Sequence, residues 1–192
     1  MNPLPYDRNE VVRFSMEATC RVEVLSGEGV AVPAQCVHSF LQPGRTDVFF
    51  LAHVPPLGSA AYRIVPTGEE LPTPEPSGKW ADVQSGAASF RIAENGTVLE
   101  AAIQGHPVLK GPGHDLHYLS EDGTIVGGAG RPGTMRCFSG EIGHILRVDA
   151  PIGDIPVEIE FIATPFNACL EFSTRFHFSG NAIGVMWEDW TK

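Results

Sequence analysis

Two adjacent carboxylates near the C-terminus lie between two tryptophans, an arrangement that suits contact with a sugar. Trp187, Glu188, Asp189 and Trp190 are consecutive in the sequence. An indole face can stack on a sugar ring while a carboxylate accepts hydrogen bonds from the sugar hydroxyls. These four residues are therefore the predicted sugar contact. The alternative is that both tryptophans cover the edge of a hydrophobic core or pack on another domain.

Three histidines in the middle of the chain are candidates for ligands of a zinc site. His106, His114 and His117 lie close together in sequence, with Asp115 among them. His114 and His117 are three positions apart, which would suit a pair of zinc ligands on a helix. The residues at 111–113, Gly-Pro-Gly, favour a loop instead, and no further ligand follows at a regular spacing. We predict that the chain has no metal site and no cofactor of its own.

The remaining candidates for catalysis are also weak. A retaining glycosidase needs two carboxyl groups about 5–5.5 Å apart, but the acidic pairs at 69–70 and 121–122 fall in a predicted linker and a predicted turn. The glycine-rich segment 123–133 lacks the Gly-Lys-Ser/Thr ending of a phosphate-binding loop. Ser139 lacks the sequence context of a nucleophile elbow. The sequence therefore predicts no catalytic residue.

Composition indicates a folded protein with many short strands. The chain has 192 residues, of which 43% are hydrophobic and 19% are charged, with 21 glycines and 16 prolines spread along it. The net charge of −10 disfavours nucleic acid and anionic lipid as partners, and no apolar run is long enough to cross a bilayer. The first ten residues do not resemble a signal peptide, so we expect a cytoplasmic protein with four reduced, buried cysteines.

The pattern of short apolar runs and breakers predicts an all-β protein of two units. Residues 1–66 are expected to form a small β-sandwich, and residues 83–192 part of a larger antiparallel sandwich. Between them, 67–82 is rich in proline and is predicted to be an extended linker. The segment 111–133 is expected to be a loose loop, and 183–187 a last short strand.

Two local patterns in the second unit are sharper. Asn95-Gly96 lies between two strand-like runs and predicts a hairpin turn, because both residues tolerate positive φ. The run 170–178 alternates between apolar or threonine side chains and charged or polar side chains. It predicts a strand whose face with Phe172 and Phe176 meets the core, and whose face with Arg175 and His177 meets solvent.

Several segments, in order, resemble the β-region of the family 38 glycoside hydrolases, which are α-mannosidases. Residues 2–8 (NPLPYDR) resemble the N-P-L-x-x-x-R entry to that region, and 32–35 (VPAQ) and 54–62 (VPPLGSAAY) are similar to its next two elements. The strand–turn–strand pattern at 90–103 resembles the start of the large family β-domain. The last ten residues, 183–192, are similar to a family stretch of the form I-G-x-x-W-x-D-x-x-K.

This resemblance implies a non-catalytic role. In the family, an N-terminal α/β domain supplies the carboxylate nucleophile and binds zinc through His and Asp, and nothing in this chain matches that domain. The large β-domain of the family is related in fold to galactose mutarotase, so a partial galactose-mutarotase-like supersandwich is expected for 83–192. The implied partner is the missing catalytic domain, against which this region would pack and shape a sugar cleft.

Two other functions stay open. An independent carbohydrate-binding module would need exposed aromatic side chains, for which Trp80, Tyr118, Trp187 and Trp190 are the candidates. A mutarotase-like enzyme would need a histidine such as His177 facing a glutamate across the sheet. If the sheet were cut at the end of the chain, its exposed edges would promote dimers or other homo-oligomers, or poor solubility.

Overall fold

The structure is a computed structural model that describes residues 1–120, 122–127 and 131–177. The described residues form strands and turns without any helix, so none of them provides a helix able to cross a membrane. All pairings between neighbouring strands are antiparallel. The chain is thus all-β and of the β-sandwich class, as its sequence predicts.

The first sandwich consists of two sheets from the N-terminal third of the chain. One sheet has the order β1-β5-β4, with β1 (Arg8–Met16), β5 (Thr46–Val54) and β4 (Ala34–His38). The other has the order β3-β2-β6, with β3 (Ala31–Val32), β2 (Cys20–Ser26) and β6 (Tyr62–Glu70). Val22 and Val24 on β2 and Val48 and Phe50 on β5 form the core between them.

The second sandwich also pairs two sheets. The larger has the order β17-β16-β15-β14-β7, with β17 (Leu170–Phe176), β16 (Val157–Ala163), β15 (Gly143–Asp149), β14 (Thr134–Gly140) and β7 (Glu75–Pro76). The smaller has the order β11-β10-β9-β8, with β11 (His106–Pro107), β10 (Val98–Ile103), β9 (Ala88–Ala93) and β8 (Trp80–Ser85). A separate hairpin joins β12 (His117–Leu119) to β13 (Ile125–Gly127).

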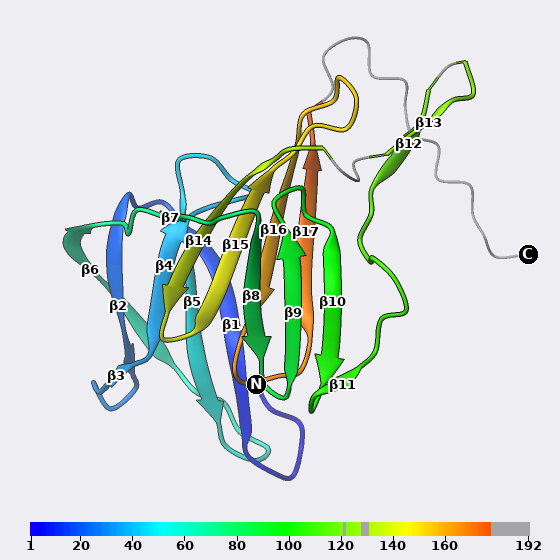
Figure 1. The fold of residues 1–192 in the computed structure, drawn as a ribbon. Coiled ribbons are helices and arrows are strands. Elements are labelled where there is room, and N and C mark those ends of the chain that lie inside the picture. The colour runs from blue at the N-terminus through cyan, green and yellow to red at the C-terminus, as the bar shows by residue number, and fades with distance from the viewer. Residues whose placement is uncertain (121, 128–130, 178–192) are drawn as a thin grey trace, which may run out of the picture.

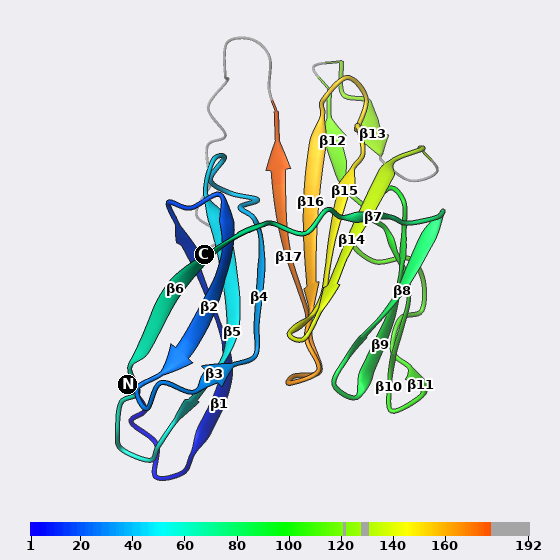
Figure 2. The ribbon, with the colours of Figure 1, turned by 90° about the vertical axis from the view of Figure 1, so that its left-hand side faces the viewer.

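These four sheets lie face to face as successive layers, which Figure 2 shows nearly edge-on. The two inner layers, β1-β5-β4 and β17-β16-β15-β14-β7, meet through a shared apolar cluster. Val37 and Phe49 of the first sandwich pack there against Phe138, Ile145 and Ile162 of the second. Because this contact buries large side chains from both sandwiches, it joins them into one body.

The inner strands are consequently buried on both faces. On β5, Val48 and Phe50 enter the core of the first sandwich, whereas Phe49 enters the layer between the sandwiches. On β15, Leu146 enters the core of the second sandwich while Ile145 faces the first. Strands of this kind carry apolar side chains on successive residues instead of alternating with polar ones.

A group of buried charges lies in the same contact between the sandwiches. The Arg13 guanidinium is 2.6 Å from Asp47 Oδ2 on β5 and 2.8 Å from Glu160 Oε1 on β16. Arg147 on β15 reaches the other oxygen of Glu160 at 2.8 Å and also donates a hydrogen bond to the His38 carbonyl. The side chains of Asp47 and Glu160 are fully buried. We call Arg13, Asp47, Glu160 and Arg147 the interface charge network.

Aromatic rings and a hydroxyl complete this network. The guanidinium of Arg13 lies 5.1 Å from the ring centroid of Phe49, and that of Arg147 lies 5.1 Å from that of Phe138. Ser15 donates a hydrogen bond to the second oxygen of Asp47. Cation–π contacts of this kind are stronger when the cation is withdrawn from water, so the charges are compensated inside an apolar layer.

The predicted linker, 67–82, is less separate than its prolines suggest. Strand β6 continues to Glu70, and it contains Pro66 opposite Val22 next to a register irregularity. Glu75 and Pro76 form β7, which pairs with β14. Both strands lie at the edges of their sheets within the described residues, where a proline removes no ladder bond that a neighbour needs. The division into units at 66 and 83 stays a prediction.

The turn predicted at Asn95-Gly96 is confirmed. It connects β9 to β10, Gly96 has φ +84°, and the Asn95 side-chain oxygen accepts a hydrogen bond from the Thr97 amide at 3.1 Å. A Cβ on Gly96 would also lie 2.4 Å from Ile159 Cδ1. Glycine is therefore needed there both for its backbone conformation and for the close approach of β16.

The prediction for the faces of β17 is only partly confirmed, because Leu170 packs on the core of the second sandwich but the two phenylalanines of the same face do not. Phe172 and Phe176, expected in the core, are 57% and 43% exposed. Arg175, expected in solvent, instead lies 4.8 Å from the ring centroid of Phe40 and pairs with Glu158 at 2.8 Å. The reason is that the face of β17 with polar residues is turned toward the first sandwich, while the strand lies at the edge of its sheet among the described residues.

Two further expectations need correction. The segment 111–133 is not simply a loose loop, because it contains the hairpin of β12 and β13. All four cysteines are free, but only Cys36 is buried, and Cys169 is exposed. Burial raises the pKa of the Cys36 thiol, as expected for an unreactive core cysteine.

Replacing Arg13 with alanine is expected to destabilise the protein strongly. The substitution leaves Asp47 and Glu160 buried with only part of their compensation, which costs about 3–5 kcal/mol in comparable sites. Urea unfolding followed by circular dichroism measures the loss. Arg8→Ala is the matched control, because Arg8 pairs with Glu10 at 2.9 Å on the exposed part of the same strand. The control should lose no more than about 1 kcal/mol; an equal loss in both variants would contradict the role of the network.

The network also predicts a specific pH dependence. Burial acts to raise the pKa of Asp47, but hydrogen bonds from Ser15, Arg13 and Ser39 outweigh it and hold the pKa below its ordinary value. A carboxyl group with a lowered folded pKa stabilises the fold above its unfolded pKa of about 3.9, and this contribution disappears as the pH falls further.

Asp47→Asn should therefore be less stable than the wild type at pH 7. The difference between their free energies of unfolding should shrink as the pH falls below about 4. Urea unfolding of both proteins across this range provides the measurement. A difference that stays constant with pH would show that Asp47 is not the titrating group.

Candidate functional site

The four residues predicted to contact sugar, Trp187, Glu188, Asp189 and Trp190, lie outside the described residues. The predicted last strand at 183–187 lies outside them as well. The sugar contact at this segment stays a prediction. A candidate site in the described part of the chain must come from other side chains.

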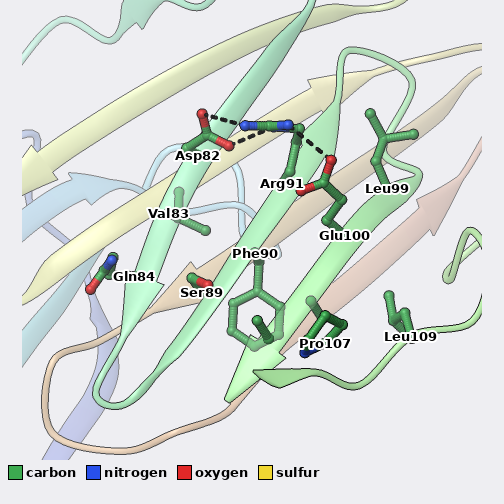
Figure 3. A pocket seen from close by; sticks show the side chains of 12 residues that line it. Asp82, Val83, Gln84, Ser89, Phe90, Arg91, Leu99, Glu100, Pro107 and Leu109 are labelled. Carbon is green, nitrogen blue, oxygen red and sulfur yellow. Dashed lines mark hydrogen bonds and ion pairs between the residues drawn. The ribbon is translucent and has the colours of Figure 1, made fainter. Parts of the chain in front are cut away.

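A groove on the outer face of the β8–β11 sheet brings several such side chains together. It has a volume of about 430 Å³ and is lined by residues of β8, β9, β10 and β11 and by Leu109 just beyond them. This size lies within the range of small-molecule sites, about 300–1,000 Å³. Figure 3 shows the groove with Asp82, Arg91 and Glu100 along one side and Pro107 and Leu109 near the other.

Cross-strand pairing positions the charged row of the groove. Asp82 on β8 is opposite Arg91 on β9, which is opposite Glu100 on β10. Arg91 Nε lies 2.8 Å from Asp82 Oδ1, and Arg91 Nη1 lies 2.9 Å from Glu100 Oε1 (Figure 3). Hydrogen bonding to Asp82, and then the charges of Asp82 and Glu100, raise the pKa of Arg91. The row therefore carries one cation between two anions.

The neighbouring positions add uncharged polar groups and apolar surface. Gln84 and Ser89 are paired across β8 and β9, one row away from the charges. Leu99 and Leu109 line the groove and are partly exposed. Trp80 lies two positions before Asp82 on the same strand, so both point to the same side of the sheet, and its side chain is 55% exposed. We call Trp80, Asp82, Gln84, Ser89, Arg91 and Glu100 the outer-sheet site.

The histidines considered for metal binding do not converge. His114 packs against Phe161 and Phe172, whereas His117 pairs with Asp115 at 3.1 Å and His106 is exposed on β11. Among residues 1–120, 122–127 and 131–177, no group of three or more His, Cys, Asp or Glu side chains is arranged to hold a metal ion.

The acidic residues of the described region serve mostly in ion pairs. Glu69 pairs with Arg21 at 3.1 Å, and Asp122 accepts hydrogen bonds from Ser120 and Thr124. Glu121 lies outside the described residues. Glu69 and Asp122 are therefore engaged in local structural contacts.

The histidine–glutamate pairing required for a mutarotase-like site is present. His177 Nε2 lies 3.2 Å from Glu158 Oε1, and Arg175 lies 2.8 Å from the other oxygen of the same carboxylate. In an acid–base pair that acts on a sugar, each group must reach the substrate. A direct contact between the two groups leaves no room for a sugar ring between them, so this pairing resembles a structural ion pair.

Tyr118 is less suited to sugar contact than its sequence position suggested. Its ring is partly buried and packs against the core of the second sandwich. Of the aromatic candidates in the described residues, Trp80 alone is exposed next to a groove.

Sequence reasoning missed the outer-sheet site because Asp82, Arg91 and Glu100 lie on three different strands, separated by the β8–β9 and β9–β10 turns. The signal was present in the alternation of Trp80, Asp82 and Gln84, but Trp80 and Asp82 had been assigned to the linker. It also missed Asp47 and Glu160, whose burial depends on the contact between the sandwiches.

Comparison with known proteins does not assign this chain to a family. No model of a known protein family matches it. No curated protein matches it either. Its function must therefore be argued from the residues and their arrangement.

Proposed function

We propose that this chain is the non-catalytic β-region of an α-mannosidase-like glycosidase. In this role it would form a rigid support that packs on a separate catalytic domain and shapes its sugar cleft. The full-length protein would hydrolyse α-mannosides with the zinc of its catalytic domain. The family is suggested by five sequence segments that follow one another as they do in the family: 2–8, 32–35, 54–62, 90–103 and 183–192.

The observation that carries the proposal is the joining of the two sandwiches. The interface charge network and the apolar cluster around Phe49 and Phe138 hold them in one orientation. A support for a catalytic domain needs this property, because any movement within it would alter the geometry of the cleft. The groups that titrate in the described residues are engaged largely in structural pairs, which favours support over catalysis.

The purified chain is expected to lack catalytic activity by itself. Its rate of hydrolysis of 4-nitrophenyl α-mannoside, with added zinc, should equal that of buffer. The mutarotation of fresh α-glucose, followed by polarimetry, should also proceed at the buffer rate. Hydrolysis above buffer would contradict the non-catalytic role, and accelerated mutarotation would support the weaker alternative, a mutarotase-like enzyme using His177 and Glu158.

The positive test is the gene sequence immediately upstream of the codon for Met1. An open reading frame that encodes an α/β domain with clustered His and Asp residues is expected. That longer protein should hydrolyse the aryl mannoside. An upstream sequence that encodes no such domain would remove the proposal.

The outer-sheet site favours a second candidate, an independent carbohydrate-binding module. Its one cation between two anions leaves the row with a single net negative charge, with carboxylate, amide and hydroxyl groups beside apolar surface and an exposed indole. A neutral sugar has hydroxyl groups for the polar row and an apolar ring face for Trp80. The net charge of −10 disfavours anionic ligands at the same place.

Titration of the wild type with mannose and mannobiose tests this candidate, with isothermal calorimetry and tryptophan fluorescence as the readouts. We expect binding in the millimolar range, about −4 kcal/mol. Arg91→Ala should weaken it at least tenfold because Asp82 and Glu100 lose their fixed positions. Arg136→Ala is the matched control, since Arg136 is similarly exposed and paired with Asp149 at 2.8 Å on another sheet.

The outcomes separate the hypotheses. No heat or fluorescence change up to millimolar sugar would exclude the binding module but leave the support role intact. Binding that Arg91→Ala and Arg136→Ala leave equally strong would place the sugar away from the outer-sheet site.

A further inference from the structure

The segment that follows β11 covers one side of the second sandwich. Residues 108–120, which we call the strap, run alongside β10 and include β12 (Figure 1). The Val98 amide donates to the Gly113 carbonyl at 2.9 Å and the Gly113 amide donates to the Val98 carbonyl at 2.8 Å. Leu116 and Tyr118 then pack on the core of the second sandwich. The strap is thus tied to β10 by the Val98–Gly113 bridge and by the Val108 amide, which donates to the Ala101 carbonyl at 2.9 Å, and otherwise by a few side chains.

His114 is the central anchor of the strap. Its backbone has φ +52°, an uncommon conformation for a residue other than glycine. Its ring centroid lies 4.4 Å from that of Phe172 on β17 and 5.2 Å from that of Phe161 on β16. Its Nδ1 lies 3.1 Å from the Gly96 carbonyl oxygen in the β9–β10 turn. One imidazole therefore connects the strap to three other elements.

The burial of the ring, rather than its bond to Gly96, favours the neutral form. A carbonyl oxygen only accepts hydrogen bonds, so Nδ1 carries the proton and the lone pair is on Nε2. Nε2 is buried and has no hydrogen-bond partner among the described residues. Protonation would place a charge and an unpaired N–H group at this buried position, which is unfavourable.

The groups around His114 do not supply a compensating charge. β16 presents Phe161, β17 presents Phe172, and the β9–β10 turn presents a carbonyl that is already bonded to Nδ1. Within the strap, one oxygen of Asp115 pairs with His117 at 3.1 Å, and the other is buried without a hydrogen-bond partner in the described part of the chain. Burial lowers the pKa of His114, and the bond to Gly96 offsets part of this effect.

We propose that the strap is a pH-sensitive cover, which neutral His114 holds closed and protonated His114 releases. Release would expose Phe161 and the core side of Leu116 and Tyr118. In the open strap His114 has an ordinary pKa of about 6.5. The opening equilibrium is therefore constant above that pH and rises up to tenfold for each pH unit below it, until the pH reaches the lower pKa of the closed form. This inference does not depend on the proposed function.

Amide hydrogen exchange, read by NMR, tests the proposal. The Val98 and Gly113 amides report opening because they form the bridge between the strap and β10. After correction for the intrinsic exchange rate, their protection in the wild type should fall by up to about fivefold between pH 6.5 and pH 5.5. His114→Asn should remove this dependence, because asparagine tolerates positive φ and can donate to Gly96 but does not titrate.

His117→Asn is the matched control, as it removes the other histidine of the strap, whose side chain is 48% exposed. It should keep the pH dependence of the wild type. A wild type with constant protection would overturn the proposal, as would a His114→Asn variant that still responds to pH. If His114→Asn does not fold, the wild type alone provides the test. The loss of amide protection must then parallel the protonation of the His114 ring, which NMR measures. A His114 ring that titrates at or above pH 6.5 refutes the proposal.

Discussion

Two buried carboxylates and the arginines that reach them determine how this molecule is assembled. Asp47 belongs to the first sandwich and Glu160 to the second, and Arg13 contacts both. Withdrawing such charges from water is costly unless each is paired and hydrogen-bonded. Two contacts of the arginines cross between the sandwiches, since Arg13 of the first pairs with Glu160 of the second and Arg147 of the second donates to the His38 carbonyl of the first. The network therefore specifies one relative orientation of the sandwiches.

That orientation explains the character of the inner layers. A small sandwich standing alone would expose the outer face of β5, yet Asp47 and Phe49 on that face are buried. The larger sheet likewise covers Ile145 and Ile162 with the first sandwich. Gln35 adds a hydrogen bond from its side chain to the Phe138 carbonyl at 3.3 Å. The contact between sandwiches is thus a third core, and this is the property that favours a supporting role.

The outer layers carry the exposed surfaces that are suited to binding a ligand. The β8–β11 sheet has one face on the core, and its outer face carries the outer-sheet site and the groove that Leu109 also lines. Its charges are exposed and paired, so they stabilise the fold little and remain available to a ligand. The strap covers another side of the same sandwich through His114. Rigid inner layers and adaptable outer surfaces are therefore separated in this fold.

The sequence by itself determined the fold class, most strands and the sharpest turn. Period-two alternation and frequent breakers are local properties, so they predicted the strand–turn–strand pattern at 90–103 and a strand within 170–178, and Asn95-Gly96 predicted its hairpin. The tertiary structure alone decided which faces are buried. Arg175 and the face of β5 with Asp47 look solvent-directed in sequence, but in each case the opposite sandwich covers them. The outer-sheet site likewise exists only because strand register aligns Asp82, Arg91 and Glu100. Pairing between strands and packing between sheets depend on residues distant in sequence, and local patterns do not encode them.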